Sequence, residues 1–370
     1  MSIPETMQAI LLTGYGGLDR LKVVDDHPVP VPGEGEVLIE VGAAGVNNTD
    51  INTRTGWYAQ SVTGGTGEGA ADGYGYVDTG KSSWSGAALT FPRIQGADVC
   101  GRIVATGSKA DEGRIGERVL VQSMQPQEPD ENGLAILTFG ADFDGGFAEY
   151  AVAKSDMTLS VESPLSDVEL ASFPCAYSTA ENMLERIGLG EGETVLITGA
   201  SGGVGSAAVQ LAKRRGAQVI AVASRAKHDF VAGLGADRLV DRGDDLLETV
   251  GEMAVDVVVD LVAGAQWPSL IACLRRGGRY VSAGAIGGPI CELDLRTLYL
   301  HDLTLAGSTY QPRSVFENLV GYIERGEIRP VVSKVYGFSQ VAEAQTDFIE
   351  KHYPGKLVMV PDRLAEGAGS

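Results

Sequence analysis

The sequence contains few residues that could hold a metal or a disulfide framework. Its four cysteines are far apart and form no CxxC pair: Cys100, Cys175, Cys273 and Cys291. Thiols scattered in this way disfavour both a disulfide scaffold and a structural zinc site. The four histidines also lie in no ligand spacing. The sequence therefore predicts no metal site.

Long apolar runs and an excess of positive charge are missing too. No uninterrupted apolar run approaches the roughly 18 residues that span a bilayer, and the start, MSIPETMQAILL, lacks the basic and apolar regions of a signal peptide. These absences predict a cytoplasmic protein without a membrane partner. The formal net charge of −20 would repel a phosphate backbone, so nucleic acid is not an expected partner.

The chain is long enough for two domains, and its patterns change along its length. At 370 residues it exceeds one usual domain. Residues 7–58 and the stretch from IQGADVCGRIVATG to GGFAEYAV alternate short β-like runs with turns. Between them, residues 59–92 are rich in Gly, Ser, Thr and Asp without a period, which predicts a long loop.

A different pattern begins at Thr194, where strand-like and helix-like runs alternate as far as residue 308. This alternation predicts an α/β fold with a doubly wound parallel sheet. After it, a helix-like run and the strand-like GKLVMVP return. We therefore expect a dinucleotide-binding domain at 159–308, inserted into a β-rich catalytic domain made of 1–158 and 309–370.

A Gly-rich turn in TVLITGASGGVGSAAVQL joins the first strand of this block to a helix, the context that a dinucleotide fingerprint requires. Gly202 and Gly203 would let the backbone approach a pyrophosphate, and Gly205 would let the helix pack close to the strand. The helix N-terminus would then face the negative charge.

Several ordered motifs together resemble the medium-chain dehydrogenase/reductase superfamily, and within it the zinc-independent quinone oxidoreductases. They are GEVLIEVGAAGVNNTD, FPRIQGADVCGRIVATG, GGFAEYAV, TGASGGVGSAAVQLAKRRGA and HYPGKLVMV. The resemblance implies a Rossmann domain, a GroES-like catalytic domain and a homodimer. Ala200 stands where the superfamily's usual GxGxxG has its first Gly, as is frequent in the quinone oxidoreductase branch.

The catalytic zinc ligands of related alcohol dehydrogenases are largely replaced. The resemblance matches the first Cys ligand to Asn47, the His to Ala97 and the Glu to Asp98, and only Cys175 keeps its ligand type. One Cys and one Asp are too few for a catalytic zinc. Cys175 is then predicted to be either a small buried residue behind the nicotinamide or a reactive thiol.

Without a Lewis acid, the expected substrate is already electrophilic: an enone or a quinone that accepts a hydride from NADPH. The resemblance places Asn47 and Tyr58 against this small-molecule substrate and Thr49 at a proton-relay position. Asp50 is a further candidate, either catalytic or a hydrogen-bonding residue of the β-rich, barrel-like domain. An enoyl-CoA reductase and a non-catalytic NADPH-binding protein remain alternatives. The first would need a basic groove, for which Arg54, Lys81 and Arg93 are the candidates.

The cofactor preference is predicted from the end of the second strand of the α/β block. NAD-specific sites carry an acidic residue there, whereas this chain has Ala223 followed by Ser224, Arg225 and Lys227. The expected cofactor is therefore NADPH. The full set of expected cofactor-binding residues is Thr179, Ala200, Ser201, Gly202, Gly203, Val204, Gly205, Ser224, Arg225, Lys227, Val262, Gly284, Ala285, Ser308 and Lys356.

The loop at 59–92 departs from the zinc-independent pattern. Trp57, Tyr74, Tyr76 and Trp84 could make it a substrate wall or lid. A disordered or oligomer-contacting surface loop is the alternative.

Overall fold

A computed structural model of the chain describes residues 3–74, 83, 85–86, 88–127 and 136–365. The chain folds into two compact units. Unit 1 comprises Met1–Val62, Gly69–Cys175 and Pro312–Ser370, and unit 2 comprises Thr63–Glu68 and Ala176–Gln311. Among the described residues, no helix is long and apolar enough to cross a membrane.

The first boundary lies later than the expected position after residue 158. The reason is that β10 (Thr158–Ser160) pairs antiparallel with β6 (Arg118–Val121), and α2 (Asp167–Leu170) packs against β3 (Glu36–Gly45). Apart from Thr63–Glu68, the chain therefore belongs to unit 1 until Cys175.

Unit 2 is built on a six-stranded parallel sheet with the order β13-β12-β11-β14-β15-β16. The strands are β11 (Thr194–Ile197), β12 (Gln218–Ala223), β13 (Arg238–Asp241), β14 (Val255–Asp260), β15 (Leu274–Ser282) and β16 (Thr304–Gly307). The order reverses between β11 and β14, which is the arrangement of dinucleotide-binding sheets. The expected doubly wound fold is confirmed.

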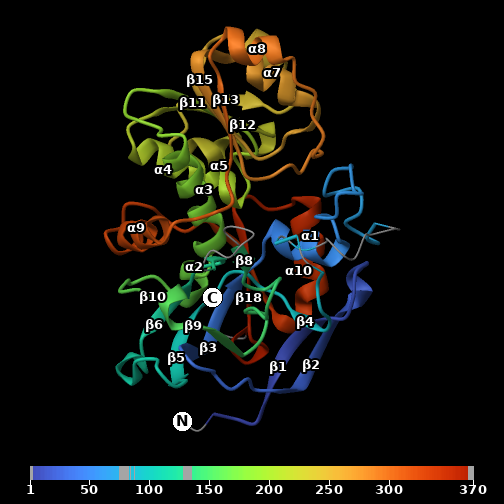
Figure 1. Cartoon of the computed structure of the whole chain (residues 1–370), viewed down its shortest axis with the longest axis vertical. Helices are drawn as coiled ribbons and strands as arrows, with labels where there is room; N and C mark the ends of the chain where they lie inside the picture. Colours follow the sequence, from blue (N-terminus) through green and yellow to red (C-terminus); the bar gives the residue numbers. More distant parts are fainter. Residues whose placement is uncertain (1–2, 75–82, 84, 87, 128–135, 366–370) are drawn as a thin grey trace. The chain divides into compact units, whose positions relative to one another are not determined.

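Helices cover both faces of this sheet (Figure 1). They are α3 (Pro174–Arg186), α4 (Gly203–Arg214), α5 (His228–Ala232), α6 (Leu246–Thr249), α7 (Trp267–Ala272) and α8 (Leu295–Leu300). Because crossovers between parallel strands are right-handed, α4 and α5 lie on one face and α6, α7 and α8 on the other. One core cluster joins Leu246, Leu270 and Ile271 to the strand residues Leu196 and Val258.

Unit 1 contains two larger sheets. One has the order β10-β6-β5-β3-β18-β17 with β9 paired to β3, and the other the order β2-β1-β4. The remaining strands are β1 (Thr6–Leu12), β2 (Leu21–Pro28), β4 (Arg93–Ile94), β5 (Cys100–Thr106), β7 (Met124–Pro126), β8 (Ile136–Thr138), β9 (Tyr150–Lys154), β17 (Val332–Gly337) and β18 (Lys356–Val360). The β-rich first domain expected from the sequence is confirmed.

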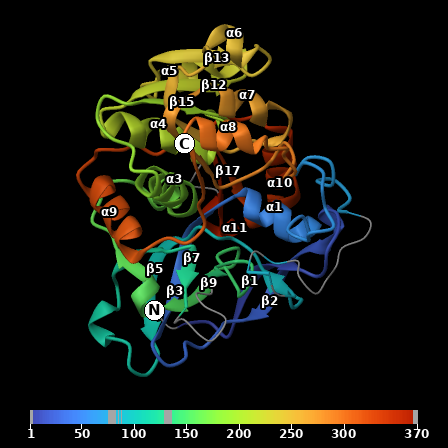
Figure 2. The same cartoon turned by 45° about the horizontal axis from the view of Figure 1, so that its top comes forward.

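The helices of unit 1 are α1 (Asn48–Thr55), α2, α9 (Arg313–Glu324), α10 (Val341–Glu350) and α11 (Asp362–Ala365). Figure 2 shows α1 beside α10. Arg54, fully buried, joins them by donating Nε–H to Gln345 Oε1 at 2.8 Å. Its other nitrogens donate to the carbonyl oxygens of Gly16 and Ala70, so Arg54 also holds the start of the long loop.

The described residues of the loop at 59–92 form turns and bends, as the sequence predicts. Trp57 and Tyr58 contact edge to face, with ring centroids 5.6 Å apart, and Tyr74 packs over Gly69. Tyr76, Lys81 and Trp84, which were expected to contribute to a substrate wall or a basic groove, lie outside the described residues.

Candidate active site

The expected cofactor-binding residues of unit 2 gather at one edge of its sheet. The Gly-rich turn follows β11, Ser224 to Lys227 follow β12, Val262 follows β14, Gly284 and Ala285 follow β15, and Ser308 follows β16. All of these strands are parallel, so these segments lie at the carboxyl end of the sheet. Ligands of doubly wound folds bind at this edge.

The Gly-rich turn has the close packing that its glycines predict. Gly199 has a φ of 59°, and α4 begins at Gly203 with Gly202 as its N-cap. A Cβ on Gly205 would collide with the carbonyl oxygen of Gly199 and with Cα of Ala200. Glycine at 205 therefore lets α4 start directly against the turn, with its first N–H groups directed at the place where a pyrophosphate would bind.

The charged residues after β12 lie close to Arg242, a further cation that the sequence analysis did not identify. Ala223 lies in register with Asp241 at the end of β13, and the backbone N–H of Arg242 donates to Ala223 O at 3.1 Å. Burial, followed by the positive charge of Arg242, lowers the pKa of Lys227. The parallel register of β12 and β13 places Arg242 beside Ser224. Local sequence patterns do not reveal this register, so Arg242 could not be identified from them.

Arg225 is partly engaged within the protein. Its backbone N–H donates to Asp241 Oδ2 at 2.7 Å, and its guanidinium lies 3.8 Å from the same carboxylate. The side chain is still 81% exposed. Lys227 and Arg242 therefore supply cationic charge beside Ser224 in addition to Arg225.

A second group missed by the sequence analysis is Asp260, which ends β14 and is fully buried. Its carboxylate accepts hydrogen bonds from Thr198 Oγ1 at 2.6 Å and from Tyr280 Oη at 2.7 Å. The backbone N–H groups of Val262 and Ala263 also donate to it. Ala263 has a φ of 55° and a ψ of −139°, a backbone conformation unfavourable for a residue with a Cβ. Asp260 therefore fixes the loop that carries Val262.

Three more expected cofactor residues lie in unit 2. Ser308 accepts a hydrogen bond from Asn182 Nδ2 of α3 at 2.8 Å. Gly284 O accepts one from Ser282 Oγ at 3.0 Å. Thr179 is half-buried on α3.

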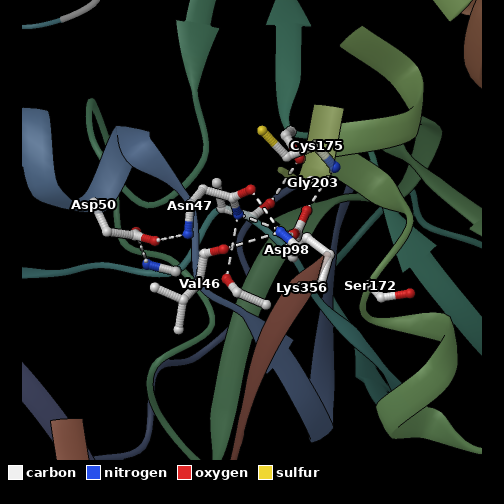
Figure 3. Close-up of polar contacts among 12 residues, drawn as sticks. Val46, Asn47, Asp50, Asp98, Ser172, Cys175, Gly203 and Lys356 are labelled. Carbon is white, nitrogen blue, oxygen red and sulfur yellow. Dashed lines mark hydrogen bonds and ion pairs between the residues drawn. The ribbon is translucent and has the colours of Figure 1, made fainter. Parts of the chain in front are cut away.

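Lys356 lies in unit 1, where it forms the centre of a buried polar cluster rather than part of the carboxyl edge (Figure 3). It is 1% exposed. Its ammonium donates to Val46 O at 3.0 Å, Asn47 Oδ1 at 2.6 Å and Asp98 Oδ2 at 2.8 Å. These three contacts match its three N–H donors. A role as a cofactor contact, which the resemblance implies, stays a prediction and requires one donor to change partner.

Asp98 connects three segments of unit 1. Besides Lys356, it accepts from Asn47 Nδ2 at 2.8 Å and from the backbone N–H of Cys175 at 2.5 Å. It is fully buried, and a Cβ on Gly45 would collide with its Oδ2. A buried carboxylate is stable only when paired and hydrogen-bonded in this way.

Asn47 is oriented by the same cluster. Its Nδ2 donates to Asp98 and, at 3.3 Å, to Gly45 O, while its Oδ1 accepts from Lys356. Both amide hydrogens are therefore directed at protein acceptors. The structure thus differs from the expectation that this amide faces substrate, and an oxyanion-binding role for Asn47 would require a rearrangement.

The other three candidate catalytic residues lie on or next to α1. Asp50 caps the helix, because its Oδ2 accepts from the backbone N–H of Asn47 at 2.8 Å and its Oδ1 accepts from Gly96 at 3.1 Å. Burial raises the pKa of the Asp50 carboxyl to about 7, against the lowering effect of these two hydrogen bonds. Its observed contacts are those of a hydrogen-bonding residue of the β-rich unit 1.

Tyr58 and Thr49 are brought together. Burial raises the pKa of the Tyr58 phenol well above its ordinary value, while the side chains of Asn52 and Thr49 act in the opposite direction. Thr49 is 5% exposed. The phenol is therefore a neutral hydroxyl at any physiological pH, able to donate a hydrogen bond.

The residues at the zinc position do not fit a zinc ion. Asn47, Ala97, Asp98 and Cys175 offer one thiol and one carboxylate, and the Lys356 ammonium already pairs with that carboxylate. A second positive ion at this place would be repelled by the ammonium. Within the described part of the chain, no group of three or more His, Cys, Asp or Glu residues could hold a metal.

The basic groove that a CoA ester would need is not formed by the candidate residues that the structure describes. Arg54 is buried and engaged with three acceptors, and burial lowers the pKa of its guanidinium to about 10. Arg93 pairs with Asp144 at 2.9 Å and also donates to Thr90.

Comparisons with known proteins agree with this architecture. Residues 33–163 match the alcohol dehydrogenase GroES-like domain family, and residues 203–325 match the zinc-binding dehydrogenase family. A crystal structure from Sinorhizobium meliloti 1021 with an alcohol dehydrogenase assignment is 46% identical and has a TM-score of 0.86. The match covers 97% of this chain and 98% of that chain.

Two curated relatives are similar at lower identity. The acryloyl-coenzyme A reductase of Metallosphaera sedula is 27% identical, over 95% of this chain and 99% of its own length. The quinone oxidoreductase of Sus scrofa is also 27% identical, over 96% of this chain and 98% of its own length. The chain belongs to the medium-chain dehydrogenase/reductase superfamily, in its quinone-oxidoreductase-like branch.

Proposed function

We propose that this protein is a zinc-independent reductase that uses NADPH to reduce an activated carbon–carbon double bond or a quinone. The observation that carries the proposal is the Lys356 ammonium, bonded to Asn47 and Asp98 at the zinc position. A site without a Lewis acid cannot readily polarise and deprotonate a simple alcohol. It can act on a substrate that is already electrophilic.

The cofactor site of unit 2 fits NADPH. The turn from Ala200 to Gly205 and the N-terminus of α4 would hold the pyrophosphate. Ser224, Arg225 and Lys227, with Arg242, would bind the ribose 2′-phosphate. NADPH bound here would supply the hydride that the reduction consumes.

The chain's own contribution is to orient the substrate and to stabilise negative charge on its oxygen. We assign this donation to the hydroxyls of Tyr58 and Thr49, because the amide hydrogens of Asn47 are directed at Asp98 and Gly45. A neutral phenol donates without itself carrying charge. Removing one donor to an oxyanion typically costs about 10²-fold to 10³-fold in turnover.

An enoyl-CoA reductase is the second candidate. The similarity to an acryloyl-coenzyme A reductase favours it. The engagement of Arg54 and Arg93 within the protein counts against a phosphate-binding groove built from those two residues.

A substrate panel tests the proposal. NADPH oxidation is measured with enones, quinones, acryloyl-CoA, crotonyl-CoA and simple aldehydes. Faster turnover of free enones or quinones supports the proposal, and faster turnover of the CoA esters supports the second candidate. Binding of NADPH without turnover of any substrate would indicate a non-catalytic binding protein. A Tyr58→Phe variant should then lower turnover while leaving the NADPH dissociation constant nearly unchanged.

We further propose that the protein is a homodimer formed through unit 2. Strand β16 is an edge strand of its sheet, with no further strand paired beyond it among the described residues. Large apolar side chains on and before α8 are exposed: Ile290 at 67%, Leu295 at 64% and Tyr299 at 62%. Several large apolar side chains exposed on one short segment are a candidate interaction site. Sedimentation of wild type and of Leu295→Glu would test it, with Val31→Glu, exposed in unit 1, as the matched control.

A further inference from the structure

The first part of the long loop, Thr63–Glu68, belongs to unit 2 although its flanking residues belong to unit 1. It docks on the loop that follows β15. The backbone N–H of Thr66 donates to Ile286 O at 3.2 Å. A Cβ on Gly65 would lie 2.7 Å from the same carbonyl oxygen, so glycine at 65 permits this close approach.

The loop that receives this segment is tied to the loop held by Asp260. Gly287 N–H donates to Val262 O at 2.8 Å, and a Cβ on Gly264 would collide with Gly287 O. These two loops follow β14 and β15, beyond the point where the strand order reverses. The half of a dinucleotide that carries nicotinamide binds on this side, since the adenosine half lies over the strands that include β12.

Thr66 places its hydroxyl group beside the loops that follow β14 and β15. The residue is 7% exposed, and its Oγ1 has no hydrogen-bond partner among the described residues. A buried hydroxyl without a partner carries a desolvation cost, so such a group in a binding region calls for a ligand. A threonine hydroxyl both donates and accepts, and it therefore complements a carboxamide, which carries N–H donors and a carbonyl acceptor.

We propose that Thr66 binds the carboxamide of the cofactor's nicotinamide ring, so that the long loop contributes a cofactor contact. The inference rests on the proposed NADPH function. Gly65 and the Ile286 carbonyl place the segment, and the Thr66 hydroxyl makes the contact. Because Thr66 belongs to the same unit as the Gly-rich turn, the contact involves the nicotinamide and not a substrate held by unit 1.

Calorimetric titration of the full-length protein with three nucleotides tests this contact. The nucleotides are NADP⁺, its 3-acetylpyridine analogue, which lacks the carboxamide N–H groups, and 2′,5′-ADP, which lacks the nicotinamide. Thr66→Val removes the hydroxyl at nearly constant shape, and Thr66→Ser restores it. Thr63→Val makes the same chemical change at an exposed position of the same segment.

We expect Thr66→Val to weaken NADP⁺ by about 2-fold to 10-fold, the value of one neutral hydrogen bond. It should weaken the acetylpyridine analogue less and 2′,5′-ADP not at all. Thr66→Ser and Thr63→Val should bind as wild type does. Unchanged binding of NADP⁺ to Thr66→Val, or an equal loss for 2′,5′-ADP, would overturn the proposal.

Two glycine variants separately test the placement of the segment Thr63–Glu68. Gly65→Ala should displace the segment from the Ile286 carbonyl and produce the same selective loss, whereas Gly67→Ala should not, because a Cβ there meets no atom within 4 Å. Equal behaviour of the two variants would contradict the docking. If wild type binds neither NADP⁺ nor 2′,5′-ADP, the proposed function itself fails, and that outcome is distinct from failure of the Thr66 contact alone.

Discussion

Replacing Lys356 by Met should strongly destabilise unit 1, because the change leaves Asp98 buried without its cation. Met has a similar length and no charge, so the packing of the aliphatic stem is largely kept. Asp98 would keep the N–H groups of Asn47 and Cys175 but would lose the ion pair at 2.8 Å. Both partners are almost completely buried, at 2% and 0% side-chain exposure, so water cannot replace the ammonium.

The expected loss can be stated as a magnitude. Removing one partner of a buried ion pair costs about 3–5 kcal/mol. For a unit of about 150–250 residues, 1 kcal/mol shifts the Tm by about 2–4 °C. The Tm of unit 1 should therefore fall by about 6–20 °C. Lys109→Met, which breaks an exposed pair with Glu34 at 72% and 62% side-chain exposure, should leave the Tm almost unchanged.

Differential scanning calorimetry, combined with a double variant, provides the assay. Asp98→Asn removes the negative charge, so Lys356→Met with Asp98→Asn should be less destabilised than the sum of the two single losses. A Tm of Lys356→Met within about 2 °C of wild type would refute the reasoning. Strictly additive losses would show that the two charges do not stabilise each other.

Three further predictions follow from the same geometry. Burial raises the folded-state pKa of Asp50 to about 7, so the folded chain binds a proton that the unfolded chain releases near pH 4. The free energy of unfolding should therefore fall as pH rises from about 4 to 7, by about 4 kcal/mol at most. Urea unfolding should show this pH dependence in wild type and a flatter one in Asp50→Asn. Elemental analysis should find no stoichiometric zinc, and chelators should leave activity unchanged; about one zinc per chain with chelator-sensitive activity would contradict the assignment of Lys356. Lys227→Ala should weaken binding of NADPH by about 10-fold to 100-fold and binding of NADH little. Arg238→Ala, at the exposed start of β13, should affect the binding of neither cofactor. Equal losses of affinity for both cofactors in Lys227→Ala would argue against a 2′-phosphate site.

The parts of the fold that depend on local sequence were predictable. The Gly-rich turn carries its own signal, because an apolar strand, glycines and a helix follow one another within TVLITGASGGVGSAAVQL. The alternation of strands and helices after Thr194 likewise predicted the parallel sheet. These features need no knowledge of distant partners.

The contacts of Lys356 were not predictable in this way. They arise because β18 pairs antiparallel with β3, with Val358 opposite Gly45, which brings Lys356 to Val46 and Asn47. That register joins residues about 310 positions apart, and no local pattern encodes it. Asp260 did carry a weak signal, since a carboxylate at the end of the apolar run VDVVVD must find buried donors.

The position of Lys356 near the end of the chain also has a consequence for the order in which the two domains are completed during translation. Strands β11 to β16 are contiguous in the sequence, between residues 194 and 307, so their sheet can form as soon as they have left the ribosome. Unit 1 begins earlier but needs β17 and β18, which are synthesised after them. Until Lys356 emerges, Asp98 lacks its cation. The domain that starts first therefore finishes last: all strands of the inserted sheet have been synthesised while the first domain still lacks β17 and β18.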